Sequence, residues 1–211
     1  GDADISDEPS TQYLPQWEET PGVKALPAYP PRTDAFFFVF SISTAANQAI
    51  YSGKLDGDGI PPDFFEDRDL RKAFAYAFDY DGYIKDALRG LAVQPSGCIP
   101  PGILGHDPRL PRYSLDLKKS EDHLRRAWKG AVWEKGFKFA LYYNAGNSAR
   151  KVACEILKRN IESLNPKFKI DVRSLDWSSY IAGLRQRKFP MFLLGYLASF
   201  ADPDSPATAF L

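Results

Sequence analysis

Three features of the sequence predict an α/β fold with a mixed sheet flanked by helices. Short apolar runs typical of buried strands alternate with longer segments whose apolar residues recur every three or four positions. The segments between the later strands are long enough to hold crossover helices, which join parallel strands. The 211 residues, of which 44% are hydrophobic, suffice for one substantial core. A single domain over residues 1–211 is therefore expected.

The N-terminal part, residues 1–35, is predicted to be extended and irregular. Prolines are frequent there and interrupt any helical periodicity. The apolar run at residues 36–40 is typical of a buried strand, so the α/β unit is expected to occupy residues 36–211. A stretch rich in glycine and proline predicts a long loop over residues 43–66.

Three helices are predicted next, each beginning at an aspartate that can cap its first turn. The first begins at Asp67 or Asp69, the second at Asp79 or Asp81, and the third at Asp116. Gly90 ends the second helix, and proline and glycine predict a surface loop over residues 95–113. The apolar faces of the first and third helices are Leu70, Ala73, Phe74 and Ala77, and Leu117, Leu124, Ala127 and Trp128.

The remaining chain predicts the order strand, helix, strand, helix, strand. Phe137, Phe139, Leu141 and Tyr143 alternate as one face of a half-buried strand, and a turn follows at residues 144–148. A long amphipathic helix comes next and ends at Asn165 and Pro166. The strand at 168–172, the helix capped by Asp176 and the central buried strand at 191–197 complete the sheet. The buried side of the long helix is predicted to be Val152, Cys154, Ile156, Leu157, Ile161 and Leu164.

Charge and composition narrow the classes of function. Lys and Arg total 27, as do Asp and Glu, so the net charge is zero. The chain therefore has no general electrostatic attraction to nucleic acid or anionic lipid. The acidic N-terminus resembles no secretory signal, so the protein is expected to be cytoplasmic or a piece of a longer chain. Cys98 and Cys154 form no CxxC motif; a disulfide stays possible, but two separate small apolar residues are favoured.

Several motifs, in unbroken order, resemble the extracellular solute-binding proteins of ABC importers, peptide/nickel-binding class (family 5). Residues 67–79 are similar to the family's D-x-x-x-R-x-A-x-x-x-A-x-D signature, with Asp67 in its leading position. The segments Gly90-Leu91-Ala92, Ile99-Pro100-Pro101-Gly102 and Tyr113-Ser114-Leu115-Asp116 follow in the family's order. Gly195-Tyr196 followed by Asp202-Pro203-Asp204 is similar to its G-W…D-P-D segment.

The resemblance implies one lobe of a type II-like (cluster C) periplasmic binding protein, cut from a longer chain near its crossover strands. Gly1-Asp2-Ala3-Asp4 resembles a family segment just before the first crossover. The implied function is to bind oligopeptide-like or other small polar solutes between two lobes and deliver them to ABC permease subunits, without catalysis or cofactors. The implied location is periplasmic or anchored at the cell surface, as in a lipoprotein, and any membrane association is indirect.

The cleft is expected at the carboxyl ends of the strands. Its ligand-binding residues are predicted to be Tyr143, Asn144, Asn147, Tyr196, Ser199, Phe200 and Asp202. In peptide-binding relatives an Asp after the G-W pair holds the ligand's ammonium, and Ser199 occupies that position here. Because a hydroxyl cannot neutralise an ammonium, a sugar-like or blocked-peptide ligand stays an alternative.

Other functions find weaker support. A hydrolase or other enzyme on an α/β scaffold remains the competing hypothesis, because a fold alone does not fix function. No nucleophile elbow or phosphate loop occurs, and helix capping explains the acidic pairs. The acidic loop 56–67 lacks calcium-site spacing, and His106 and His123 lack zinc-site partners, so no metal is expected. The scattered Trp17, Trp128, Trp133 and Trp177 are predicted to pack in the core.

Overall fold

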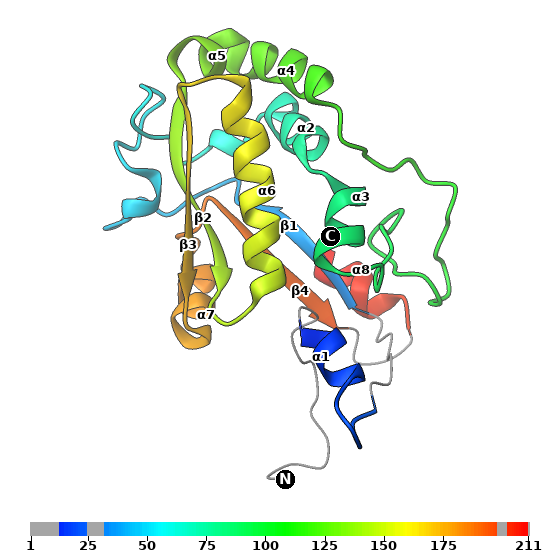
Figure 1. Cartoon of the computed structure of the whole chain (residues 1–211). Helices are drawn as coiled ribbons and strands as arrows, with labels where there is room; N and C mark the ends of the chain where they lie inside the picture. Colours follow the sequence, from blue (N-terminus) through cyan, green and yellow to red (C-terminus); the bar gives the residue numbers. More distant parts are fainter. Residues whose placement is uncertain (1–12, 25–31, 198–201, 211) are drawn as a thin grey trace.

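The protein is an α/β unit built on a four-stranded sheet (Figure 1). The computed structural model describes residues 13–24, 32–197 and 202–210. The strands lie in the order β1-β4-β2-β3, with bounds β1 Arg32–Phe38, β2 Phe137–Asn144, β3 Phe168–Leu175 and β4 Met191–Leu197. β4 pairs antiparallel with β1 and parallel with β2, and β2 pairs parallel with β3. The mixed sheet that the sequence predicted is confirmed, with β4 in a central position.

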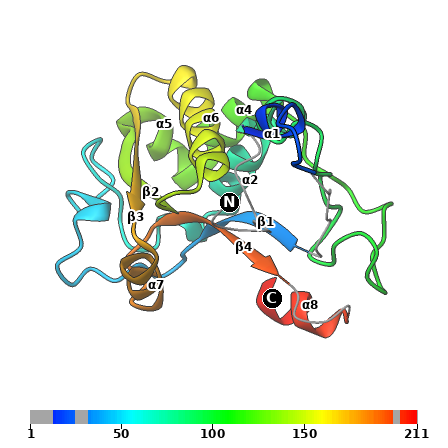
Figure 2. The same cartoon turned by 60° about the horizontal axis from the view of Figure 1, so that its bottom comes forward.

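Helices cover both faces of this sheet (Figure 2). α6, α2, α4 and α5 lie on one side, and α7 lies on the other. Both α6 and α7 are crossovers between parallel strands, as expected. The helix bounds are α1 Leu14–Glu18, α2 Arg68–Ala77, α3 Tyr80–Gly82, α4 Leu117–Arg126, α5 Ala131–Lys135, α6 Ser148–Leu164, α7 Trp177–Arg185 and α8 Asp204–Phe210, with single 3-10 or π turns at Gln48–Ile50, Phe64–Glu66, Tyr83–Ala87 and Ala127–Gly130.

The predicted caps are confirmed at four helices. The carboxylates of Asp67, Asp79, Asp116 and Asp176 accept hydrogen bonds from backbone N–H groups in the first turns of α2, α3, α4 and α7. Each bond satisfies one of the N–H groups that a helix leaves without a partner. The helix boundaries were predictable because a cap is a local interaction.

A phenylalanine cluster fills the core between the sheet and α2. Phe139 is fully buried, and its ring centroid lies 5.4 Å from that of Phe65 and 6.0 Å from that of Phe74. Phe64 and Phe137 belong to the same cluster. The predicted apolar face of α2, from Leu70 to Ala77, is buried against it.

The other face of the sheet packs on α7, which makes β2 a fully covered strand. Ala140 and Tyr142 are buried in a second cluster with Tyr180 and Phe189. The prediction that β2 is half-buried was therefore wrong. The alternation of apolar residues along a strand predicts that one face is buried. Burial of the opposite face depends on packing against α7, which is distant in sequence.

Other local predictions need correction. Within residues 1–35, predicted to be irregular, the structure has the short helix α1, with Pro15 at its start where proline is tolerated, and the first residues of β1 from Arg32. Val152 lies on the exposed side of α6 and is 41% exposed. Helix α4 stops at Arg126, since Trp128 and Lys129 have left-handed backbone angles. No helix among the described residues is both long and apolar enough to span a bilayer.

Candidate functional site

The carboxyl ends of β2, β3 and β4 lie at the same end of the sheet, at the bottom of Figure 1. The turn between β2 and α6, the start of α7 and the segment after β4 follow these strand ends directly. We refer to residues 144–148, 176–178, 196–197 and 202 as the rim. In open α/β sheets ligands bind at this end of the strands, so the rim is the candidate site.

Arg150, near the start of α6, is the central residue beneath the rim. Its guanidinium is buried and donates to the Asp34 carboxylate at 2.9 Å from Nε and 2.7 Å from Nη2. Its Nη1 also donates to Oδ1 of Asn144 at 2.6 Å. Nearby, Tyr83 donates to the carbonyl of Ala149 at 3.2 Å, and burial, followed by the Asp34 charge, raises the Tyr83 pKa to about 12. Arg150 thus joins β1, β2 and α6 at one point.

Gly195 of β4 lies directly against this ion pair. It is the register partner of Asp34, and a Cβ atom there would lie 2.5 Å from Nη2 of Arg150 and 2.7 Å from Oδ1 of Asp34. No side chain fits at those separations without moving the pair. The structure therefore gives a physical reason for the glycine in the Gly195-Tyr196 motif.

The two predicted asparagines both lie on the rim and both bond to Arg150. Oδ1 of Asn144 accepts from the guanidinium, and Oδ1 of Asn147 accepts from the backbone N–H of Arg150 at 2.9 Å. Asn147 is also the N-cap residue of α6. The structure therefore brings Asn144 and Asn147 together around one residue that the sequence had not singled out.

The other predicted residues are placed differently. Tyr143 is 9% exposed and packs in the core cluster on the α6 side, so its position favours a packing role. The Tyr196 hydroxyl bonds to the hydroxyl of Ser205 on α8. Asp202 is exposed and accepts from the backbone N–H of Asp204 at 2.9 Å. Ser199 and Phe200 lie outside the described residues.

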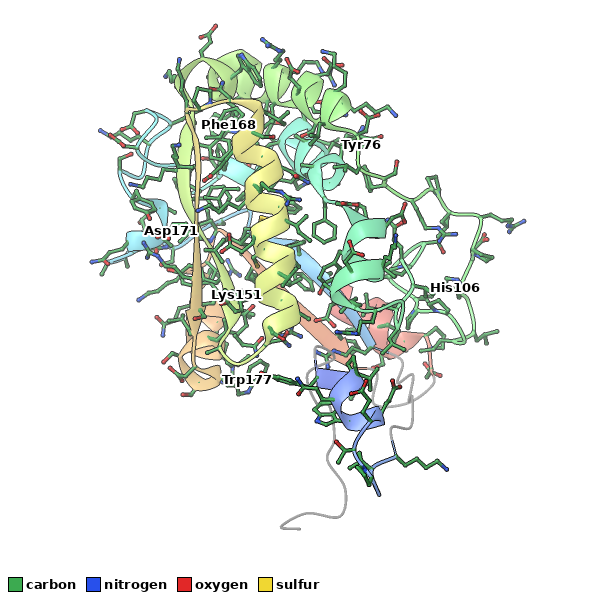
Figure 3. All side chains as sticks on the ribbon, viewed as in Figure 1. Tyr76, His106, Lys151, Phe168, Asp171 and Trp177 are labelled. Atoms are coloured by element: carbon green, nitrogen blue, oxygen red, sulfur yellow. The ribbon has the colours of Figure 1, made fainter. Side chains whose placement is uncertain are left out.

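Trp177 is a rim residue that sequence reasoning missed. It is 56% exposed, so the prediction that it packs in the core was wrong. Figure 3 shows it at the lower end of the molecule, where β3 leads into α7. Its ring stacks on Tyr180 at a centroid distance of 6.1 Å, which leaves one face outside the core. Its position directly after the Asp176 cap at a strand end was the available signal.

Two open hollows lie away from the rim. One, of about 480 Å³, is lined by Tyr51, Ser52, Lys138, Arg173 and neighbouring polar groups. There the Tyr51 hydroxyl donates to Asp171 at 2.7 Å and accepts from Arg173 at 3.0 Å. Burial and the Asp171 bond raise the Tyr51 pKa, although Arg173 opposes them. The other hollow, of about 360 Å³, is mainly apolar and lies beside β1.

The two cysteines and the two histidines lie in separate local environments. Cys98 and Cys154 are free thiols, and burial raises the pKa of Cys154 to about 12, as fits a core residue. His106 and His123 bond to Ile99 and Asp69 respectively. No group of three or more potential metal ligands occurs among the described residues.

Comparisons with known proteins point to one family. The family described as "Bacterial extracellular solute-binding proteins, family 5 Middle" matches residues 1–211. The Dipeptide-binding protein of Escherichia coli (strain K12) is 26% identical over 147 residues, which cover 66% of this chain and 26% of that protein. The Oligopeptide-binding protein OppA of Bacillus subtilis (strain 168) is 24% identical over 139 residues, covering 64% of this chain and 25% of that one.

A solved structure shows the same fold. The dipeptide binding protein from Pseudoalteromonas sp. SM9913, solved in complex with Met-Leu, superposes with a TM-score of 0.73 at 17% identity, over 94% of this chain and 35% of that one. The chain spans about a quarter of the length of the curated relatives it matches. Since the family description matches the whole sequence, the chain belongs to the bacterial extracellular solute-binding proteins of family 5.

Proposed function

We propose that this chain supplies one wall of the solute-binding cleft in a two-lobed binding protein of an ABC importer. The observation that carries the proposal is the rim, where three parallel strands end together. An exposed aromatic ring lies there together with two side-chain amides, and both amides bond to the buried Arg150. An aromatic surface beside a few fixed polar groups is typical of small-solute sites, and such sites favour domain interfaces.

The proposed solute is a peptide or a related small polar molecule. Family membership supports solute binding rather than catalysis, and two of the similar proteins carry peptide-binding names. Handover to permease subunits and a periplasmic or surface-anchored location belong to the same proposal. The second lobe is supplied by the remainder of a longer chain, which is consistent with the length of the relatives.

A thermal-shift screen on a two-lobed protein that contains this chain tests the proposal. Dipeptides and oligopeptides are expected to raise the melting temperature, because a ligand that binds only the folded state stabilises it. Trp177→Ala should reduce the shift by removing the exposed ring of the rim. Leu104→Ala is the matched control, because Leu104 is 81% exposed on the long loop before α4, which projects to the right in Figure 1.

Two results would contradict the proposal. Equal shifts in the Trp177 and Leu104 variants would place solute contact away from the rim. Stabilisation by sugars with no response to any peptide would instead support the alternative ligand class. In either case the melting temperature without ligand serves as the reference for each variant.

A further inference from the structure

We propose that Arg150 is a positioning residue that makes the rim select an oxygen acceptor of the solute. The guanidinium of Arg150 orients the side-chain amide of Asn144 and its backbone N–H orients that of Asn147, so that both amides offer N–H donors. The acceptor would be a carbonyl or carboxylate oxygen of a peptide-like solute. This inference rests on the proposed function and specifies the chemistry of the same site.

The orientation of both amides follows from what Arg150 can do. A guanidinium and a backbone N–H are donors only. Nη1 of Arg150 lies 2.6 Å from the side chain of Asn144, and its backbone N lies 2.9 Å from that of Asn147. In both contacts the asparagine must therefore turn its oxygen toward Arg150. The amide orientation is set by chemistry and not by a choice between similar atoms.

The Nδ2 groups are left for other partners. Nδ2 of Asn144 makes only a long contact of 3.5 Å with the carbonyl of Ala145. Within the described part of the chain, Nδ2 of Asn147 has no hydrogen-bond acceptor, and both residues are partly exposed. Two amides three residues apart in one turn thus present donors at the surface.

Arg150 keeps its position beneath these amides, so the asparagine oxygens stay turned toward it and cannot accept from a solute. Arg150 is fixed by two bonds to Asp34, and Gly195 leaves room for that pair. The Asp34 carboxylate is already shared with Nε of Arg32 at 2.9 Å. A solute ammonium placed at the asparagines would meet donors, whereas a carbonyl or carboxylate oxygen would complete two hydrogen bonds.

The test introduces Asn144→Asp and Asn147→Asp into a two-lobed protein that contains this chain. Aspartate still accepts from Arg150 and still caps α6, so the fold is retained. It replaces the Nδ2 donor with an acceptor oxygen. Asp116→Asn, an exchange of the opposite kind at the cap of α4, is the matched control. Binding of the dipeptide Met-Leu and of its C-terminal amide is followed by NMR titration, which detects weak complexes.

The expected result is that Met-Leu shifts the side-chain N–H signals of Asn144 and Asn147. Each Asp variant should weaken binding about fivefold or more, as expected for one lost hydrogen bond, and Asp116→Asn should not. Weaker binding of the amide identifies a carboxylate as the acceptor, and equal binding identifies a carbonyl. If the acceptor is a carboxylate, Arg150→Lys should lower the preference for Met-Leu over its amide. If the acceptor is a carbonyl, Arg150→Lys should weaken the binding of both probes equally.

Two failures are distinguishable. If rim signals respond to the dipeptide but neither Asp variant weakens binding, the inference is wrong and the proposed function stands. If no signal of residues 144–148, Trp177 or Tyr196 responds to either probe, both the inference and the proposed function are wrong.

Discussion

The two ends of β2 differ in chemistry although they belong to one buried strand. At the amino end Phe137 and Phe139 pack in a cluster of aromatic rings that excludes water. At the carboxyl end Asn144 accepts from the buried Arg150, which is paired with the partly exposed Asp34. Apolar contacts are non-directional and stabilise in proportion to buried area, whereas charged hydrogen bonds fix orientation. One end of the sheet therefore provides stability, and the other provides a defined arrangement of donors.

The largest effect is expected at the aromatic end. Phe139→Ala should lower the free energy of unfolding by about 3–5 kcal/mol, because it leaves a cavity among fully buried rings. Urea denaturation measures the change. Val152→Ala on the exposed side of α6 is the control and should stay within about 0.5 kcal/mol. Equal effects of both substitutions would show that the cluster is not the main stabilising region.

A somewhat smaller loss is expected at the rim. Arg150→Met should cost about 2 kcal/mol, because it removes charge-assisted hydrogen bonds to Asp34 and Asn144, although the partly exposed Asp34 carboxylate still accepts from Arg32. Lys151→Met, at the exposed neighbouring position, should have little effect. The double variant with Asp34→Asn should cost less than the sum of the single variants. Strict additivity would mean that the two residues do not interact.

A third substitution tests the hydrogen bonds that join α2 to the bend after α4, beside the aromatic cluster. Asp67 accepts from the N–H groups of Leu70 at 2.9 Å and Trp128 at 2.8 Å, so it joins α2 to the bend after α4. Asp67→Ala should cost about 1–2 kcal/mol in urea unfolding. Asp63→Ala serves for comparison, since Asp63 makes no side-chain cap bond. If Asp67→Ala lowers the free energy of unfolding no more than Asp63→Ala does, Asp67 does not stabilise the contact between α2 and the bend after α4.

The smallest effect concerns acid stability at the same end. The hydrogen bond with His123, helped by the Arg126 charge, lowers the Asp69 pKa below its usual 3.8. Asp69 therefore stabilises the fold above pH 3.8, and this contribution disappears as the pH falls through the lower folded-state pKa. Asp69→Asn should flatten the loss of unfolding free energy below pH 4, measured by urea titrations at several pH values. If the free energy of unfolding depends on pH in the same way in both proteins, Asp69 does not contribute to acid stability.

The sequence predicted the helix caps and the later strands because these depend on neighbours along the chain, and it predicted the parallel pairs from the long crossover segments. It began the first strand at residue 36, whereas β1 begins at Arg32 and pairs with β4, which is distant in sequence. It did not predict Arg150, whose partner Asp34 is 116 residues away. It placed Tyr143 both on the apolar face of a strand and in the ligand site, and the structure favours the first placement. Trp177 was assigned to the core because its exposure depends on where α7 lies against the sheet.

We propose that the rim, and not the hollow beside Tyr51, forms the wall of the cleft. Hydrogen–deuterium exchange of the two-lobed protein, with and without a bound peptide, tests it most directly. If the rim forms the cleft wall, peptide binding slows exchange at residues 144–148 and 176–178 and leaves exchange at residues 51–59 unchanged. Protection of residues 51–59 without any change at the rim would contradict it.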